Sequence, residues 1–238
     1  MSHSDDNLRS FWNRWIEEYL EKHKPDGPSL RRGQEAIAII DSLSLDRPRI
    51  LEVGCANGWL AAQLAQFGQV TGVDIADEAI ERARVKIPTV EFFAGDFTTM
   101  DDLKSQFDIV IALETIGNVP NHELFVSHLV AAMKPGGHLI LSCQNKFVFE
   151  RREDLPTPPP GQIRNWLDRS HLKRLLKRHF QIEKSFTILP AGHLGILRFL
   201  NSYRLEDLAQ RAGLDRWFTR IREQLGLGQS ILIHARLR

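Results

Sequence analysis

The chain has 238 residues and a formal net charge of +1, and apolar residues make up 42% of it. This composition excludes a disordered, collagen-like or coiled-coil chain, and the two cysteines exclude a disulfide scaffold. No apolar run reaches the ~18 residues of a membrane span, and the polar N-terminus lacks the pattern of a secretory signal, so we expect a cytoplasmic protein.

The first half of the chain alternates between strand and helix patterns. Apolar residues recur at helical spacing over 8–22, and a second helix is expected over 30–43. Gly68 is interpreted as the stop of the third helix. The alternation predicts a parallel sheet covered by helices on both faces. Strands are expected over 49–53, 69–75, 89–95, 107–113 and 138–143, and helices over 58–68, 77–86 and 122–133.

The pattern changes at Asn145. Residues 155–161 hold four prolines, which predicts an extended, stiff segment. The strand expected at the end of the chain, over 229–237, is interpreted as an exposed edge or a dimer contact. We expect an N-terminal helix in 1–28, an α/β core in 29–144, and an insertion with closing strands of the same domain in 145–238. Within that last part the pattern predicts a helix over 168–179, a strand over 180–189, two helical pieces over 194–225 split near Gly213, and a strand over 229–237.

The informative turn follows the first strand. The chain turns from Gly54 through Gly58 into a helix, and Asp74 ends the next strand twenty residues after Gly54. Glycines at such a turn let a ligand approach the backbone, and a carboxylate at the second strand's tip can accept both ribose hydroxyls. The turn does not match the G-x-G-x-x-G pattern of dinucleotide-binding sites, because Ala56 and Trp59 occupy its second and third glycine positions. The turn therefore predicts a nucleoside site without a pyrophosphate and disfavours a nicotinamide-dependent oxidoreductase.

Four segments resemble the class I S-adenosylmethionine-dependent methyltransferases. Residues 52–58 resemble the first motif of that family, and Asp74 resembles its ribose-binding acid. Gly95, Asp96 and Phe97 resemble the motif that holds adenine, and residues 107–142 resemble the fourth strand through the fifth. The resemblance implies a Rossmann-like seven-stranded, mostly parallel sheet in the order 3-2-1-4-5-7-6, with S-adenosylmethionine as cofactor and S-adenosylhomocysteine as product. It implies cofactor contacts from Glu52, Gly54, Cys55, Ala56, Gly58, Asp74, Ile75, Asp96, Phe97 and Glu114.

The resemblance leaves the catalytic base open. Relatives that act on quinones and similar small molecules read E-x-x-E-H-V after the fourth strand, whereas Asn118 stands at the histidine position here and cannot act as a base. His122, His171 and His193 are replacement candidates, because a positioned histidine can take a proton from the acceptor. Glu114 at the strand tip is a candidate contact for cofactor or substrate. A carboxylate acceptor needs no base, since it is already ionised.

The N-terminal helix is expected to act as a lid. Trp12 and Trp15 either cover the cofactor's sulfonium through cation–π attraction or anchor the helix in the core. Arg31 and Arg32 are candidates to meet the cofactor's carboxylate.

Charge is divided unevenly along the chain, with a net −8 over residues 1–144 and a net +9 over residues 145–238. The basic helix at 169–178 is either a solvated face or a contact for an anionic substrate, carrier or membrane surface. Residues 192–238 are similar to methyltransferases of bacterial cell-surface glycan and lipid-linked sugar assembly.

We therefore expect methyl transfer to a hydroxyl or carboxyl group of a small molecule or glycan. The alternatives are methyl transfer to an amine nitrogen and a non-catalytic cofactor-binding scaffold. We expect no metal and no nucleic-acid partner, and a homodimer is compatible with the sequence.

Overall fold

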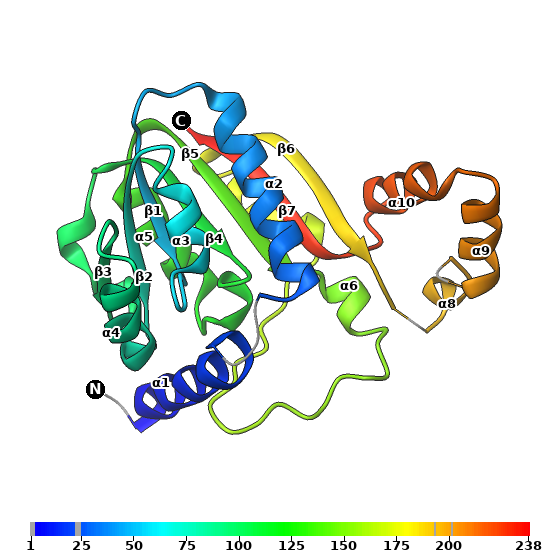
Figure 1. The fold of residues 1–238 in the computed structure, drawn as a ribbon, viewed down its shortest axis with the longest axis horizontal. Coiled ribbons are helices and arrows are strands. Elements are labelled where there is room, and N and C mark those ends of the chain that lie inside the picture. The colour runs from blue at the N-terminus through cyan, green and yellow to red at the C-terminus, as the bar shows by residue number, and fades with distance from the viewer. Residues whose placement is uncertain (1–2, 22–24, 193, 201) are drawn as a thin grey trace.

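A seven-stranded sheet forms the centre of the molecule (Figure 1). Its strands are β1 (Arg49–Val53), β2 (Gln69–Asp74), β3 (Glu91–Ala94), β4 (Phe107–Leu113), β5 (Met133–Gln144), β6 (Phe180–Pro190) and β7 (Gly228–Leu237). The computed structural model describes residues 3–21, 25–192, 194–200 and 202–238. The strand order is β3-β2-β1-β4-β5-β7-β6, which confirms the expected order. Strands β1 to β5 run parallel, and β7 is antiparallel to β5 and β6.

Helices cover both faces of this sheet, as predicted. The α-helices are α1 (His3–Trp15), α2 (Gly27–Leu43), α3 (Trp59–Leu64), α4 (Asp77–Lys86), α5 (His122–Ala132), α6 (Lys146–Phe149), α7 (Arg169–Leu176), α8 (Ile196–Leu200), α9 (Tyr203–Arg211) and α10 (Asp215–Gln224). A π-helix, η1 (Ile16–Glu21), continues α1, and 3₁₀ turns form η2 (Phe97–Thr99), η3 (Asp101–Leu103) and η4 (Ile116–Asn118). Within the described part of the chain, every helix is too short or too polar to cross a bilayer.

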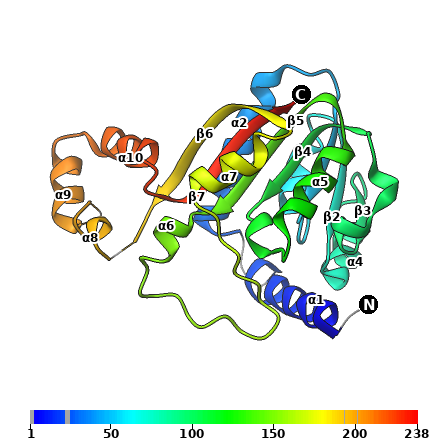
Figure 2. The same ribbon diagram turned by 180° about the vertical axis from the view of Figure 1, so that it is seen from behind.

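The two faces are built by alternating side chains of the same strands. Val110 of β4 belongs to the buried cluster that includes Phe125 of α5 and Leu172 of α7. The helices α5 and α7 lie in front of the sheet in Figure 2. Ile109 belongs to the opposite cluster with Ile39 of α2. Burial of these apolar side chains supplies most of the driving force for the fold.

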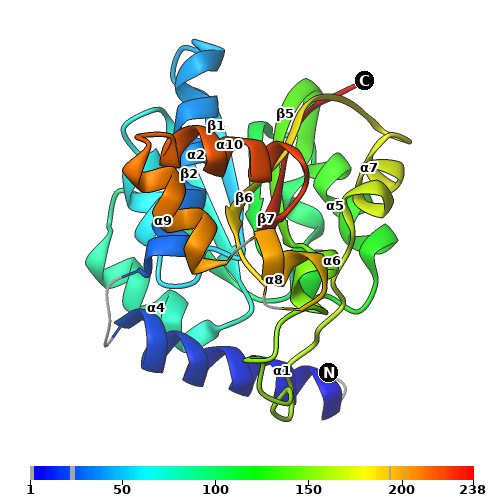
Figure 3. The ribbon, with the colours of Figure 1, turned by 90° about the vertical axis from the view of Figure 1, so that its right-hand side faces the viewer.

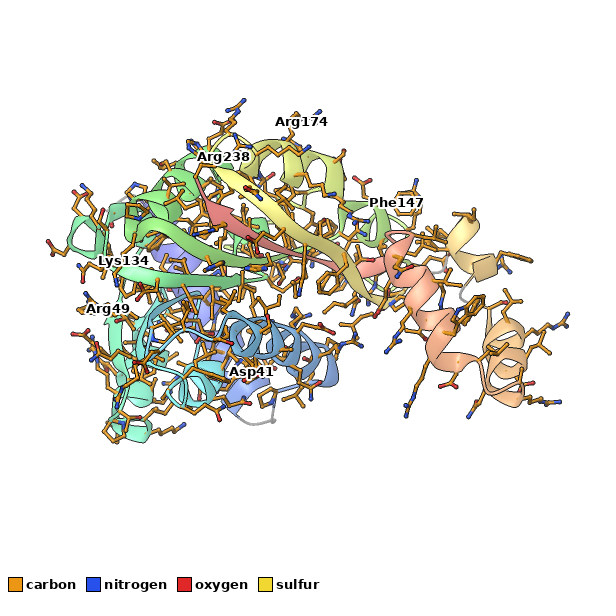
Figure 4. All side chains as sticks on the ribbon, turned by 90° about the horizontal axis from the view of Figure 1, so that it is seen from above. Asp41, Arg49, Lys134, Phe147, Arg174 and Arg238 are labelled. Carbon is orange, nitrogen blue, oxygen red and sulfur yellow. The ribbon has the colours of Figure 1, made fainter. Side chains whose placement is uncertain are left out.

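Polar side chains at helix starts set several boundaries. Asp26 accepts a hydrogen bond from the backbone N–H of Ser29 at 2.7 Å, so α2 begins at Gly27 rather than at residue 30. Asp168 accepts one from the N–H of His171 at 2.8 Å and caps α7. At the other end of the sheet Asp108 has a structural role. It accepts hydrogen bonds from the Arg49 N–H and the Lys134 ammonium at 2.8–2.9 Å, on one side of the molecule in Figure 4.

Three expectations about elements are wrong. The helix after the glycine turn ends at Leu64, and Gly68 does not stop it: a Cβ at Gly68 would lie 2.0 Å from the Pro48 carbonyl oxygen, so glycine is needed for close approach. The last strand is not an edge, because β7 pairs with β5 on one side and β6 on the other. The helical region after β6 forms α8, α9 and α10 rather than two pieces, although a break does fall at Gly213.

Two parts of the chain extend beyond the sheet. Helix α1 and the extended segment 150–165 lie across the end of the sheet, and a Cβ at Gly161 would meet the Asn7 backbone at 2.4 Å (Figure 1). Helices α8, α9 and α10 project from the body beside β6 and β7 (Figures 1 and 3). We call residues 194–225 the helical arm.

Candidate active site

A cleft of about 630 Å³ lies at the carboxyl ends of the parallel strands. Gly54 after β1, Asp74 at the end of β2, Glu114 after β4 and Gln144 at the end of β5 all line it. Helix α1 and segment 149–166 line it from the outside. Its position and its size, within the roughly 300–1,000 Å³ of small-molecule sites, fit a ligand at the switch point of an α/β sheet.

The turn after β1 is as tight as the sequence predicts. Gly54 and Gly58 adopt positive φ angles of 80° and 76°, which favour glycine. A Cβ at Gly54 would lie 2.2 Å from Thr115 Oγ1, and one at Gly58 would lie 2.7 Å from the Phe92 ring. Both glycines therefore serve close packing of the protein on itself. Gly54 also lines the cleft, whereas the predicted contact Gly58 lies outside the lining.

Asp74 joins the two loops at the cleft floor. Its carboxylate accepts hydrogen bonds from the N–H groups of Ala56 and Ala76 at 2.8 and 2.9 Å. Burial raises the pKa of Asp74, and these backbone bonds oppose the rise. Ala56 and Ile75 line the cleft as expected. Cys55 does not: its side chain is buried beside Gly72, where a Cβ would lie 2.9 Å from its sulfur.

Two further predicted residues lie beside this floor. Asp96 lines the cleft, and its side chain accepts hydrogen bonds from the N–H and hydroxyl of Thr98 at 2.8 Å, which caps η2. Glu52 is 4% exposed, and its Oε2 atom has no hydrogen-bond partner. Burial raises the pKa of Glu52, and the nearby Asp74 raises it further. The orphaned oxygen lies where a cationic or hydrogen-bond-donating ligand group would satisfy it.

Glu114 has an unusual backbone and a polar setting. Its φ is +58°, in the left-handed region, and such non-glycine residues cluster at functional sites. Its carboxylate accepts a hydrogen bond from the Ser142 hydroxyl at 2.9 Å. Burial raises the pKa of Glu114, while Arg32 and the serines Ser142 and Ser230 lower it. A buried carboxyl group therefore stands at the tip of β4 with a basicity shifted toward neutral pH.

Of the three histidine candidates, the two that the structure describes lie outside the cleft lining. His122 begins α5 outside the lining, where burial lowers its pKa, and His171 is exposed on α7. His193 lies outside the described residues. Asn118 does line the cleft and donates a hydrogen bond to the Glu114 carbonyl at 2.6 Å. Among the residues that the structure describes, the cleft lining therefore contains no histidine.

Neighbouring side chains explain part of this departure from the quinone-type pattern. A Cβ at Gly117 would lie 2.2 Å from Gln144 Oε1 and 3.5 Å from Trp166. The space that a second glutamate of an E-x-x-E-H motif would need is thus filled by Gln144 and Trp166.

The expectation for Arg31 is also wrong. Arg31 forms ion pairs with Glu35 at 2.8 Å and with Glu223 at 3.6 Å, outside the cleft lining. Arg32 lines the cleft instead, where it donates to the Ser29 hydroxyl at 2.9 Å. Adjacent helical residues point about 100° apart, so only one of the pair faces the ligand site.

The two tryptophans of α1 line the cleft and pack on each other. Trp12 and Trp15 have ring centroids 5.6 Å apart in an edge-to-face arrangement. Helix α1 is fixed to α4 by the bond from Asn13 to Asp77 at 2.8 Å and by the burial of Ile16. The aromatic cover is therefore both a wall of the cleft and part of a small core.

The sequence analysis did not predict the part of the cleft that segment 149–166 lines, which we call its outer half. Phe149 and Trp166 form an aromatic pair 4.8 Å apart, and the Arg164 guanidinium lies 5.7 Å from the Trp166 ring. Arg152 donates to Asp154 through two nitrogens and to Gln229 at 2.9 Å. The only signal was the interleaving of aromatic residues with arginine in 147–166. Other lining residues from this half are Pro120, Asn121, Leu124, Leu155, Gln162 and Ser230.

Comparisons with known proteins agree with this geometry. Residues 5–185 match a family model described as a methyltransferase domain. A ubiquinone biosynthesis O-methyltransferase of Coxiella burnetii is 25% identical over 181 residues, covering 74% of this chain and 67% of that protein. That of Alkalilimnicola ehrlichii is 36% identical over 108 residues, covering 43% of this chain and 44% of that protein. The chain thus spans about half to two thirds of these relatives.

Solved structures share the fold at low sequence identity. The N-methyltransferase NodS of Bradyrhizobium japonicum, in complex with S-adenosylhomocysteine, aligns with a TM-score of 0.67 at 14% identity, over 98% of both chains. The PH0226 protein of Pyrococcus horikoshii aligns with a TM-score of 0.64 at 17% identity, over 94% of this chain and 99% of that one. With the family match over residues 5–185, the chain belongs to the class I S-adenosylmethionine-dependent methyltransferases.

Proposed function

We propose that this protein transfers a methyl group from S-adenosylmethionine to a hydroxyl group of a small molecule or sugar. The cofactor carries the methyl group on a cationic sulfur. When the methyl group is transferred, this sulfur leaves as a neutral thioether. The protein's task is therefore mainly to hold two reactants in line at attack distance, which can supply roughly 7–11 kcal/mol. Support comes from the cleft geometry and from the O-methyltransferase relatives.

The floor of the cleft fits the nucleoside part of the cofactor. Asp74 retains carboxylate lone pairs beyond its two backbone bonds and would accept the ribose hydroxyls. Asp96 and the backbone of Phe97 line the same end and would hold adenine.

The opposite end of this floor fits the amino-acid part of the cofactor. The unpaired Glu52 Oε2 would receive the cofactor's ammonium group, and Arg32 would meet its carboxylate. Trp12 and Trp15 would face the sulfonium with their rings.

Glu114 is the group we assign as the general base, and it is the observation that carries the O-methylation proposal. As the acceptor oxygen bonds to the methyl carbon and the carbon–sulfur bond breaks, Glu114 would take the hydroxyl proton. Its raised pKa suits that role, because a base works best near the operating pH. An amine acceptor is less compatible, since Arg152 and Arg164 already place positive charge in the outer half of the cleft.

The substitution Glu114→Gln tests this assignment. With the acceptor fraction that takes up label from methyl-labelled S-adenosylmethionine, kcat is expected to fall by about 10²–10⁴-fold. The affinity for S-adenosylhomocysteine is expected to stay within twofold, which is about 0.4 kcal/mol. The wild-type rate should rise with pH through the Glu114 pKa, and the variant should lose this dependence. Glu123→Gln, an exposed partner of Arg178, is the matched control.

Retention of kcat and of the pH profile in Glu114→Gln would show that Glu114 is not the base. A carboxylate acceptor, which needs none, would then replace the hydroxyl in the proposal.

A further inference from the structure

The last helix of the arm, α10, is docked on the protein by its charged side. In α10, Arg222 and Glu223 are the buried residues, with 6% and 8% exposure. The Glu223 side chain accepts a hydrogen bond from the Leu189 N–H at 3.2 Å and pairs with Arg31 at 3.6 Å. Its backbone carbonyl accepts from the Thr187 hydroxyl at 2.6 Å.

The apolar side of the same helix faces outward. Leu214, Trp217, Ile221 and Leu225 recur at i, i+3, i+7 and i+11, which places them on one face. Leu214, Trp217 and Leu225 are 50%, 61% and 67% exposed. An amphipathic helix ordinarily buries this face, so α10 is inverted relative to the body of the protein.

The other two helices of the arm also expose apolar side chains. Ile196 and Phe199 of α8 and Leu208 of α9 are each at least 60% exposed. These helices project beyond the sheet, so the body of the protein does not cover them (Figures 1 and 3). Exposed apolar side chains gathered on one projecting part of a fold mark an interaction site.

Charge identifies the partner that this surface fits. The helical arm holds six arginines, no lysine and four acidic residues. One of the acids, Glu223, is buried against Arg31, and Asp207 pairs with Arg211 at 2.9 Å. The last third of the chain, residues 145–238, carries a net +9. Such a basic, apolar face complements an anionic lipid surface, whereas a second copy would bring a like-charged face against it.

The arm also lies on the same side as the cleft. Val148 of α6 packs with Leu197 and Leu227, which join α6 to both ends of the arm. Phe149, which ends α6, and Arg152 line the cleft. Phe147 of α6 lies on the side from which the arm projects in Figure 4. A surface bound by the arm would thus lie beside the mouth of the cleft.

We propose that the helical arm is a docking surface for an anionic membrane, into which Phe199, Trp217 and Leu225 insert while the exposed arginines of the arm, which do not include the buried Arg222, contact lipid headgroups. The arm thereby holds the outer half of the cleft at the bilayer surface. This inference is independent of the acceptor chemistry proposed above.

Vesicle sedimentation with the full chain tests the docking surface. Vesicles of phosphatidylcholine with phosphatidylglycerol should bind the protein, those of phosphatidylcholine alone should bind it weakly, and added salt should reduce binding. In Trp217→Ser/Leu225→Ser, each lost side chain should lower vesicle affinity about tenfold. Val85→Ser, at an 83% exposed site on α4, is the matched control and should bind as the wild type does.

Two measurements keep the result interpretable. All variants should retain the wild-type Tm and the wild-type affinity for S-adenosylhomocysteine, because the altered residues are exposed and outside the cleft. Equal binding to both vesicle types, or binding to neither, would overturn the proposal. So would a lipid-free dimer in sedimentation velocity that the double substitution converts to a monomer, since the face would then be an interface between copies.

Discussion

The substitution Gly54→Ala probes the packing that shapes the cleft floor. Gly54 has a φ of +80°, and an added Cβ would lie 2.2 Å from Thr115 Oγ1. That hydroxyl donates to the Val53 carbonyl at 3.0 Å, so the threonine must move and lose this bond. The left-handed backbone costs alanine about 1–2 kcal/mol, and the lost hydrogen bond costs about 0.5–1.5 kcal/mol.

Together these costs predict a loss of about 1.5–3.5 kcal/mol in the free energy of unfolding. For a chain of this size that loss lowers Tm by about 3–14 °C. Urea and thermal unfolding of the ligand-free protein measure both quantities. Gly27→Ala is the control, because its Cβ would meet no atom within 4 Å and its φ is ordinary. It should change stability by less than about 0.5 kcal/mol.

A double-mutant cycle separates the two costs. Thr115→Ala removes the obstructing hydroxyl and methyl groups, so Gly54→Ala should cost about 1 kcal/mol less in that background. The backbone cost should remain. An equal cost in both backgrounds, or a loss below about 0.5 kcal/mol in the single variant, would refute the packing of Thr115 over Gly54.

Three further predictions concern ligand binding and stability. Asp74→Ala should weaken S-adenosylhomocysteine binding in calorimetry at least ~100-fold, because two charge-assisted bonds are lost, whereas the exposed control Asp101→Ala should bind normally. Burial lowers the pKa of His138 and His234, so below the ordinary histidine pKa the unfolded chain binds more protons than the folded chain. Stability should therefore fall as pH drops through about 6.5, and His234→Gln should flatten the curve of Tm against pH; an unchanged slope would contradict this. Asp168→Ala should cost about 1 kcal/mol in urea unfolding through loss of the α7 cap, and an unaltered midpoint would argue against that cap.

The sequence was most informative for segments whose local pattern follows directly from their place in the folded protein, such as the buried strands and the ends of neighbouring strands. Apolar runs such as 107–113 became buried strands because only a sheet covered on both faces buries every residue of such a run. The spacing from Gly54 to Asp74 predicted two neighbouring strand tips, and the structure joins them through the Ala56 N–H.

The sequence did not predict with the same accuracy which side of a helix faces the cleft. The packing of the buried side of α2 on the protein decides that Arg32, and not Arg31, lines the cleft. Glu223 of α10 pairs with Arg31 over a long sequence separation. Such contacts leave no local pattern.

The outer half of the cleft was hidden for a different reason. Segment 150–165 has no helix or strand period, so nothing local places Trp166 beside Gly117 or Arg152 beside Gln229. His122 was misplaced for a similar reason. It begins α5 outside the lining, and sequence position alone does not show which way a first helical residue faces.

Methyl-labelled S-adenosylmethionine, incubated with the protein and a fractionated bacterial extract, tests the central claim most directly. The account predicts label in polar metabolites or lipid-linked sugars, held as an ether that resists alkali. Label in protein or RNA, or an alkali-labile ester, would contradict transfer to a hydroxyl of a small molecule or sugar. No label in any fraction, with cofactor binding confirmed by a raised Tm, would contradict methyl transfer to these acceptors and favour a cofactor-binding scaffold.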